Sequence, residues 1–455
     1  MLTVTAYGEV SSLINEYVNN DIFAPRDDNL FFCDNPYRRQ LLPGSLKSLD
    51  FSGVLPVSQL LSYRSLAARR ILNTIYEADF VLLPKASWQY KHDDFSRFYD
   101  LNKCKLGESI RHALEEFCFG FLEREIEVSG GWDEDSLLAF VDSLRLDKPS
   151  EATCGEKAVL NSPDPRRAAR MWLLQFAPDA LSEASSMIRN LLGSFGPAQA
   201  NWFKVVIDEY GYGVYDRKHS RPFEEALVSV GLRPDLHYYW QYYLASSLLM
   251  SNYFQYLGKN HRFVFRYLGA QYYFETVGIP WSERGGEILS EAFKGQVDIE
   301  YFQEHAHIDH HHSRMVIKDV IRPILELCGD GEIHQVVRGI KEAALIVDLA
   351  DRDVAEQITW MDSLEDIEAH EAPSSNFIKR ERLHGLGNPI MSPMRSHDER
   401  VCIRVTSGSL RLHAGLDCVL TLKDGQAVEI PKNRLYGLES ASNDSACTYH
   451  PLLVA

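Results

Sequence analysis

The segment 301–313, YFQEHAHIDHHHS, carries imidazoles and a carboxylate at a spacing that suits metal binding. His305, Asp309 and His312 are separated by four and then three residues, so on a helix they share one face. Imidazole nitrogens and a carboxylate form a ligand set for iron, manganese or zinc, and facing helices usually supply further ligands. The alternative is a histidine-rich, solvent-exposed turn, and the rest of the sequence favours the metal site.

The segment 208–219, DEYGYGVYDRKH, offers a second set of ligands. Glu209 and Asp216 are seven residues apart and would share a helical face, whereas His219 would lie about 80° away on an ideal helix. Two glycines between them weaken a helix, and a local bulge there would turn His219 back toward Glu209. The alternative is a helix that ends at the first glycine and leaves Asp216 and His219 on an exposed loop.

Two further carboxylates come from other helical stretches. Glu275 lies among aromatic residues in RYLGAQYYFETVG, and a glutamate on so apolar a face is either at its rim or a ligand. Glu183 lies in DALSEASSMIRNLL, where nothing local distinguishes it from other acids. Seven side chains are the right supply for two metal ions that keep open positions for dioxygen. The candidate ligands are Glu183, Glu209, His219, Glu275, His305, Asp309 and His312.

This order of residues, Glu, then Glu with a His ten residues on, then Glu, then HxxxDxxH, resembles the haem-oxygenase-like diiron oxidases and oxygenases. A member of this family that oxygenates nitrogen and continues into a cupin is similar over nearly the whole chain. The strings that carry this resemblance, besides the segment 301–313, are NPYRRQL (35–41), YEADF (76–80), RAARMWLLQFAPDALSEAS (167–185), WFKVVIDEYGYG (202–213), YWQYYL (239–244) and YLGKNH (256–261).

The resemblance implies three domains and a cofactor. An N-terminal helical dimerisation domain would occupy residues 1–145, a haem-oxygenase-like diiron domain residues 146–370, and a cupin residues 376–455. The seven candidate ligands would hold two irons, with dioxygen as the co-substrate and an external electron donor of unknown identity. Glu209, as an additional anionic ligand, and Asp216, as a group that orients an imidazole N–H, are the candidate catalytic residues.

The cupin departs from the family pattern. Where the family has an HxH motif, this chain has Arg395 and His397, and Tyr436 replaces a third histidine. A guanidinium stays protonated and cannot ligate a cation, so we expect a metal-free cupin and no N-nitrosation. His413 and His450 are the alternatives that could restore a metal site.

The periodicity agrees with an all-α part followed by a small all-β barrel. Apolar residues recur at helical spacing through much of the first 360 residues, with a soft boundary near 145 in the Gly-, Ser- and Pro-rich stretch 129–163 and an acidic connector at 362–376. Short apolar runs between turns then predict strands. The expected helical segments include 45–79, 105–127 and 164–193, and the expected strands are 401–405, 409–413, 418–422 and 427–430.

Composition excludes several classes of protein. The net charge of −17, of which residues 1–375 carry −19, argues against a nucleic-acid or anionic-membrane surface. The sequence has no apolar run long enough for a membrane span and no signal peptide, so we expect a cytoplasmic protein. The eight cysteines include no CxxC pair, which fits reduced thiols. The N-terminal helical domain has no ligands, so we expect it to form a homodimer.

These features together favour a diiron N-oxygenase of natural-product biosynthesis. Its substrate would be a small molecule with a guanidine- or amine-type nitrogen, either an arginine derivative or a 2-aminoimidazole, and its product an N-hydroxy or nitro compound. The alternatives are a diiron oxidase that attacks carbon, an N-nitrosating enzyme if the cupin still binds iron, and a non-catalytic metal-dependent scaffold.

Overall fold

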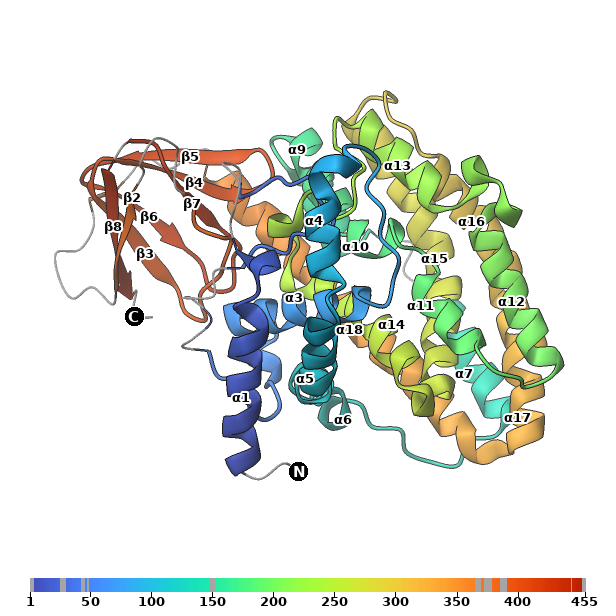
Figure 1. Ribbon diagram of the computed structural model, residues 1–455. Helices are drawn as coiled ribbons and strands as arrows, with labels where there is room; N and C mark the ends of the chain where they lie inside the picture. Colours follow the sequence, from blue (N-terminus) through green and yellow to red (C-terminus); the bar gives the residue numbers. More distant parts are fainter. Residues whose placement is uncertain are drawn as a thin grey trace.

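The computed structural model describes residues 4–24, 30–41, 46, 49–146, 152–364, 370–371, 379–384, 391–442 and 444–451. Helices form the larger part of the molecule, and two antiparallel sheets built from the C-terminal residues lie at one end of it (Figure 1). The sequence therefore predicted correctly that a mainly helical chain is followed by a small β region. No helix in the described ranges is long and apolar enough to cross a membrane.

One N-terminal helix begins later than the periodicity predicted, whereas the expected helix 105–127 begins earlier, at Leu101. The expected helix 45–79 is helical mainly from Tyr63, where the Ser62 side chain accepts a hydrogen bond from the Ser65 N–H and so caps the helix. Gly53, with φ +72°, and Pro56 keep the preceding residues in loops. The helices are α1 (Val4–Val18), α3 (Tyr63–Glu77), α4 (Trp88–Phe98), α5 (Leu101–Phe119), α6 (Leu122–Glu125) and α7 (Glu134–Leu146).

The helices that follow surround the candidate ligands. The expected helix 164–193 is broken into short pieces, and Ala184, which adopts a left-handed conformation with φ +61°, separates the last two of them. A π-helical turn (Val316–Ile321) follows α16. The helices are α8 (Cys154–Asn161), α9 (Pro165–Leu174), α10 (Ala177–Ala180), α11 (Ser185–Ile188), α12 (Pro197–Glu209), α13 (Ser220–Ser229), α14 (Ala245–Lys259), α15 (Val264–Ala292), α16 (Glu300–Met315), α17 (Arg322–Cys328) and α18 (Ile333–Ser363).

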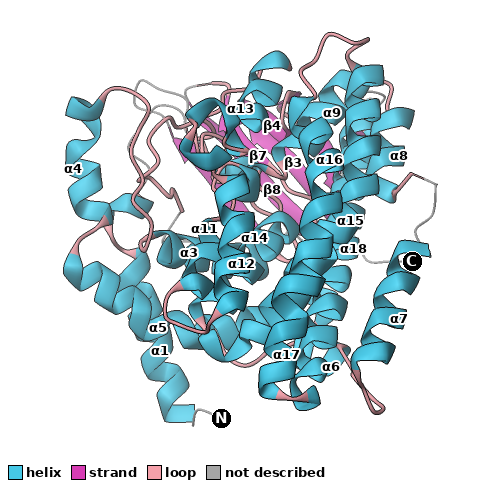
Figure 2. Cartoon of the chain, turned by 90° about the vertical axis from the view of Figure 1, so that its right-hand side faces the viewer, coloured by secondary structure: helices cyan, strands magenta, loops and turns pink. Residues whose placement is uncertain are grey.

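The β region consists of a five-stranded sheet, in the order β1-β6-β3-β8-β2, and a three-stranded sheet, in the order β5-β4-β7. All four expected strands are present, as β3 to β6. Figure 2 shows this region behind the helices. The strands are β1 (His370–Glu371), β2 (Lys379–His384), β3 (Val401–Ser407), β4 (Ser409–Gly415), β5 (Cys418–Lys423), β6 (Gln426–Ile430), β7 (Gly437–Ser440) and β8 (Asp444–Pro451).

Buried contacts cross both of the expected domain boundaries. One hydrophobic core joins residues of α3 and α5 to residues of α14, α15 and α18. The buried guanidinium of Arg70 in α3 donates hydrogen bonds to the carbonyls of Gln241 and of Met394, next to the β region. Arg434 forms a buried ion pair of 3.0 Å with Asp353 of α18. The boundary near 145 falls at the end of α7, and most of the connector 362–376 lies outside the described residues.

Candidate metal centre

Candidate ligands from distant parts of the chain meet inside the helical part. Glu183 lies in the turn between α10 and α11, and Glu209 is the last residue of α12. His219 directly precedes α13, and Glu275 lies in α15. The remaining three, His305, Asp309 and His312, lie on α16 at the spacing that the sequence predicted.

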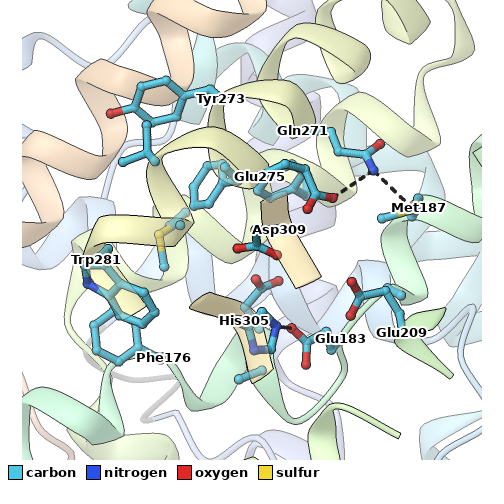
Figure 3. Close-up of a pocket in the computed structure, with 18 of the residues that line it drawn as sticks. Phe176, Glu183, Met187, Glu209, Gln271, Tyr273, Glu275, Trp281, His305 and Asp309 are labelled. Carbon is cyan, nitrogen blue, oxygen red and sulfur yellow. Dashed lines mark hydrogen bonds and ion pairs between the residues drawn. The ribbon is translucent and has the colours of Figure 1, made fainter. Parts of the chain in front are cut away.

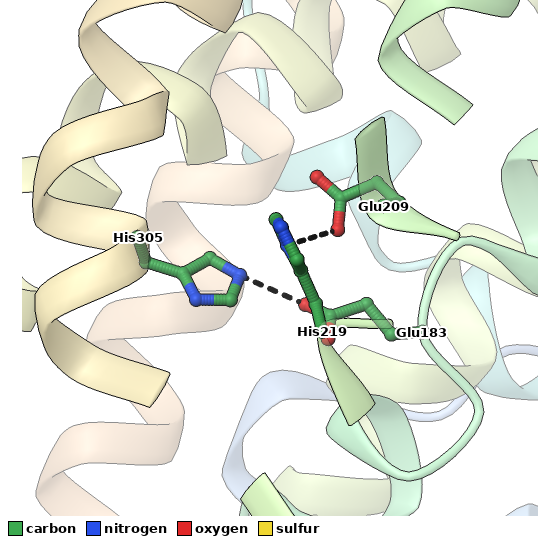
Figure 4. A group of neighbouring side chains, drawn as sticks. All are labelled: Glu183, Glu209, His219 and His305. Carbon is green, nitrogen blue, oxygen red and sulfur yellow. Dashed lines mark hydrogen bonds and ion pairs between the residues drawn. The ribbon is translucent and has the colours of Figure 1, made fainter. Parts of the chain in front are cut away.

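The first group of ligands consists of Glu183, Glu209, His219 and His305, whose ligand atoms lie within 4.8 Å of one another. Nε2 of His305 is 3.1 Å from Oε1 of Glu183, and Nδ1 of His219 is 2.7 Å from Oε2 of Glu209 (Figure 4). Two imidazoles and two carboxylates at such distances match the ligand set of a single iron.

The second group consists of Glu209, Glu275 and His312, again within 4.8 Å of one another. Nδ1 of His312 lies 3.4 Å from Oε1 of Glu209 and 3.3 Å from Oε2 of Glu275. Glu209 therefore belongs to both groups, and each of its oxygens faces a different imidazole. A carboxylate placed in this way can bridge two metal ions.

Unpartnered buried atoms support a metal site on independent grounds. Within the described part of the chain, Nδ1 of His219 and Oε2 of Glu209 form no hydrogen bond, although they are only 2.7 Å apart. Nδ1 of His312 and Oε2 of Glu183 are also unsatisfied. Buried polar atoms are rarely left without partners, and these four carry the lone pairs that a metal ion would accept. The residues present therefore fit iron.

Two contacts outside the ligand groups orient the imidazoles. Nδ1 of His305 donates to the carbonyl of Tyr301 at 2.8 Å, which directs Nε2 toward Glu183. Nε2 of His312 donates to Oδ2 of Asp208 at 3.2 Å, which directs Nδ1 toward the second group. Hydrogen bonds of this kind fix the ring orientation and the tautomer of metal-binding histidines.

Outside the two ligand groups, Asp208 rather than Asp216 is the carboxylate that contacts an imidazole of the centre. The helix α12 ends at Glu209, so Asp216 does not share a helical face with it, and its side chain is exposed in the following loop. In the described structure Asp216 contacts none of the candidate ligands. For Asp216 this agrees with the alternative in which the helix ends at the first glycine, and these contacts give no support to its expected role in orienting an imidazole.

A loop, not a helical bulge, returns His219 to Glu209. The backbone N–H of His219 donates to the carbonyl of Glu209 at 3.1 Å. Gly211 makes this loop possible: its φ is +58°, and a Cβ there would lie 2.4 Å from the carbonyl carbon of Arg217. Only glycine tolerates both this conformation and this close approach.

Asp309 lies beside the two groups without joining either. Its side chain is buried, and a Cβ at Gly278 of α15 would lie 2.5 Å from its Oδ2. The missing side chain at Gly278 thus makes room for this carboxylate. The structure brings six of the seven candidate ligands into these two groups and leaves Asp309 adjacent to them.

The candidate ligands, four carboxylates and three imidazoles, give the centre an excess of negative charge. Burial opposes ionisation of Glu209, but the imidazoles of His219 and His312 lower its pKa to about 2. Burial also opposes protonation of His312, yet the carboxylates of Glu275 and Glu209 raise its pKa to about 10. Burial, followed by the charge of Glu275, raises the pKa of Asp309 well above its ordinary value. The carboxylates thus retain protons on the imidazoles, and a metal ion would displace these protons.

Three further residues contribute to the site although the sequence gave no reason to select them, namely Trp202, Gln271 and Tyr301. Gln271 accepts a hydrogen bond from Nε1 of Trp202 at 2.7 Å, and its amide nitrogen therefore donates to Oε1 of Glu275 at 3.2 Å. The hydroxyl of Tyr301 lies 3.4 Å from Oε1 of Glu183. Gln271 and Tyr301 lie inside quoted sequence segments, but their spacing carries no ligand pattern.

A cavity of about 220 Å³ adjoins the centre. Figure 3 shows Glu183, Glu209, Glu275, His305 and Asp309 around a common space. Its apolar lining includes Ala180 of α10, Phe254 of α14 and Val277 of α15. The cavity therefore combines a ligand cluster with an apolar pocket, as an enzyme site for a small molecule requires.

Comparison with known proteins gives two matches. Residues 170–347, which include all seven candidate ligands, match a family described as iron-containing redox enzymes. The chain is also 47% identical over 449 residues to a protein of Streptomyces achromogenes subsp. streptozoticus described as nitrosourea synthase. That similarity covers 97% of this chain and 94% of the relative.

Proposed function

Because the chain belongs to the haem-oxygenase-like, iron-containing redox enzymes, we propose that it is a diiron N-oxygenase of natural-product biosynthesis. The proposed substrate is a small molecule with a guanidine- or amine-type nitrogen, and the product carries a new N–O bond. Family membership makes the protein an oxidoreductase, whereas the number of irons and the substrate belong to the proposal.

The position of Glu209 carries this proposal. Glu209 lies within ligand distance of both groups, so two metal positions would share it. Glu183, His219 and His305 would complete the first position, and Glu275 and His312 the second. Asp309 is buried beside the second group and is the proposed seventh ligand.

The residues around the irons have separate tasks. A bound diiron centre would supply the activation of dioxygen, with electrons from an external donor. Asp208 and the Tyr301 carbonyl hold two imidazoles in the tautomers that expose a lone pair to the metal. Gln271 holds Glu275 in place. The apolar lining of the cavity excludes water from the reacting nitrogen.

The β region supports N-oxygenation without N-nitrosation. We propose that it is a cupin whose metal position is occupied by protein side chains. Arg395, buried and paired through its backbone with Tyr436, donates from its guanidinium to the hydroxyls of Tyr436 (3.2 Å) and Tyr449 (2.5 Å). Nε2 of His397 lies 2.6 Å from the same Tyr436 hydroxyl. A permanent cation here disfavours an iron ion.

The alternative histidines lie in other contacts. Nε2 of His413 is 2.9 Å from Glu439, and Nε2 of His450 is 2.9 Å from the Thr448 hydroxyl. Among the described residues of the β region, no three acidic, histidine or cysteine side chains lie close enough together to hold a metal ion. This arrangement supports the proposal that the similarity to a nitrosourea synthase does not extend to nitrosation.

The test uses the full chain loaded with ferrous iron without oxygen. The protein is then exposed to oxygen and a reductant in the presence of arginine, its N-methylated forms or 2-aminoimidazole, and products are analysed by mass spectrometry with ¹⁸O₂. The proposal expects products with oxygen bonded to nitrogen. Oxygen incorporated at carbon would instead identify a carbon-oxidising enzyme, and an N-nitroso product would contradict the assignment of the β region.

A further inference from the structure

Besides Asp309, which is the proposed seventh ligand, one further carboxylate in the cavity belongs to neither ligand group. Asp179 lies in α10, four residues before Glu183, and lines the same cavity as Glu183 and Glu209. Within the described part of the chain, no side chain or backbone N–H donates a hydrogen bond to its carboxylate, and no cation pairs with it. Burial, followed by the charges of Glu183 and Glu209, raises its pKa to about 7. The ionised form of Asp179 is therefore unfavourable in the empty cavity, and a cation bound there would stabilise it.

The charged residues that line the cavity indicate that the partner of Asp179 is a cation. Among the described residues that line the cavity, five are acidic, one is histidine and none is lysine or arginine. Four of the acids, Glu183, Glu209, Glu275 and Asp309, are candidate ligands, and two ferrous ions would balance their charge. Asp179 then contributes the remaining negative charge, which a ligand with one positive charge would neutralise.

Two aromatic rings that line the same cavity as Asp179 suit a flat cation. Phe176 precedes Asp179 by one helical turn, and its ring centroid lies 4.8 Å from that of Trp281. Both rings line the cavity and lie side by side at its edge (Figure 3). Aromatic faces attract cations, and a flat cation can stack on a ring while its N–H groups reach a carboxylate.

We propose that Asp179 binds the positively charged nitrogen group of the substrate, a planar guanidinium or aminoimidazolium. This inference rests on the proposed function and deepens it by naming the residue that recognises the substrate. A carboxylate oxygen of Asp179 would accept hydrogen bonds from the N–H groups of the cation. The uncharged analogue of the same shape, a urea, would lack the charge that this site compensates.

The test measures binding without turnover, by calorimetry on the iron-loaded full chain under anaerobic conditions. The probes are L-arginine and its neutral isostere L-citrulline, together with 2-aminoimidazole. The variants are Asp179→Asn, Asp179→Glu and, as a control for the loss of one charge, Glu304→Gln on the exposed side of α16. Iron content and thermal stability of each variant show whether the centre is intact.

We expect at least one of the two cationic probes to bind the native protein, and citrulline to bind far more weakly than arginine wherever arginine binds. Asp179→Asn should keep its iron and weaken binding of the cation by about 10- to 100-fold, with partial recovery in Asp179→Glu and no change in Glu304→Gln.

Equal binding to Asp179→Asn and native protein would overturn the inference while leaving N-oxygenation intact. If Asp179→Asn lost iron, a role of Asp179 in the metal centre would replace the inference. If neither cation bound to the native protein, the inference would also be wrong, whereas ¹⁸O incorporation tests the proposed function separately.

Discussion

Glu209 and His219 approach each other twice, through a backbone hydrogen bond and through a close contact of their side chains. The N–H of His219 donates to the Glu209 carbonyl at 3.1 Å, and its Nδ1 lies 2.7 Å from Oε2 of the same residue. The loop between them thus closes on itself and presents one imidazole and one carboxylate as a unit. Because the other oxygen of Glu209 faces His312, this unit also connects the two proposed metal positions.

Removal of the shared carboxylate should lower both the iron content and the catalytic activity. In Glu209→Ala, three ligands remain in the first group but only two in the second. We expect iron content to fall from about two per chain toward one, and N-oxygenation to fall by more than about 100-fold. Colorimetric iron analysis and product formation measure both effects.

The matched control for Glu209→Ala is Glu304→Gln, which removes one negative charge from the exposed side of α16. It should keep both iron content and activity. Unlike this control, His312→Ala and Asp309→Ala should lose metal from the second position. Near-native turnover by Glu209→Ala would show that Glu209 is not a ligand.

The loop should depend on Gly211 more than on its neighbour Gly213. An alanine at 211 would combine left-handed strain with a clash against Arg217, whereas Gly213, with φ +79°, has no atom within 4 Å of an added Cβ. We expect Gly211→Ala to lower the free energy of unfolding by about 1–3 kcal/mol and to weaken iron binding. Gly213→Ala, which introduces strain alone, should cost less. Chemical denaturation and iron titration measure the difference, and equal effects of the two substitutions would contradict this explanation.

The sequence predicted which side chains come together better than it predicted the local structure between them. The spacing on α16 requires only that one helix persists, which its sequence permits. The position of His219 depends on a left-handed Gly211 and on contacts with Arg217, and no periodicity encodes these. The contact of Asp208 with His312 could not be predicted either, because it depends on tertiary packing that no local spacing encodes.

In the fold, too, local patterns predicted single elements but not the contacts between distant ones. Strands β3 to β6 were predicted from short apolar runs between turns, and all four are present. The N-terminal helices were predicted from apolar periodicity, but periodicity identifies a buried face without identifying its partner. The packing of α3 and α5 against α14 therefore could not be predicted, and neither could the hydrogen bonds of Arg70 across the molecule.

Metal-free protein should lose stability as the pH rises. In the folded protein the pKa of His312 is raised from 6.5 to about 10, so its contribution to stability is fully present below pH 6.5. That contribution is lost as the pH rises through about 10. Iron displaces the proton, so iron-loaded protein should not show this loss. Differential scanning calorimetry of both forms from pH 7 to 10 measures the effect.

The variant His312→Gln provides the control for this pH dependence. Without the imidazole, metal-free protein should show a much smaller decrease in Tm between pH 7 and 10. A decrease of the same size in His312→Gln and in native metal-free protein would assign the pH dependence to other groups.

Association should involve the N-terminal helical part. Three large apolar side chains there are strongly exposed: Val81 by 83%, Leu83 by 68% and Tyr90 by 79%. Exposed apolar groups that lie this close in sequence are typical of an interface, so we propose a homodimer that covers them. Light scattering should give a dimer for native protein and a monomer for Leu83→Glu. The control Leu327→Glu, at a residue of α17 that is 75% exposed, should remain dimeric, and a monomeric native protein at micromolar concentration would contradict the proposal.

The central claim, two irons that share Glu209, is tested most directly by anomalous diffraction at the iron edge. Crystals of protein loaded with ferrous iron without oxygen should show two peaks, one in each ligand group, with Glu209 in contact with both. The β region should show no peak near Arg395 and His397. A single peak in the helical part, or two peaks of which only one contacts Glu209, would contradict the claim.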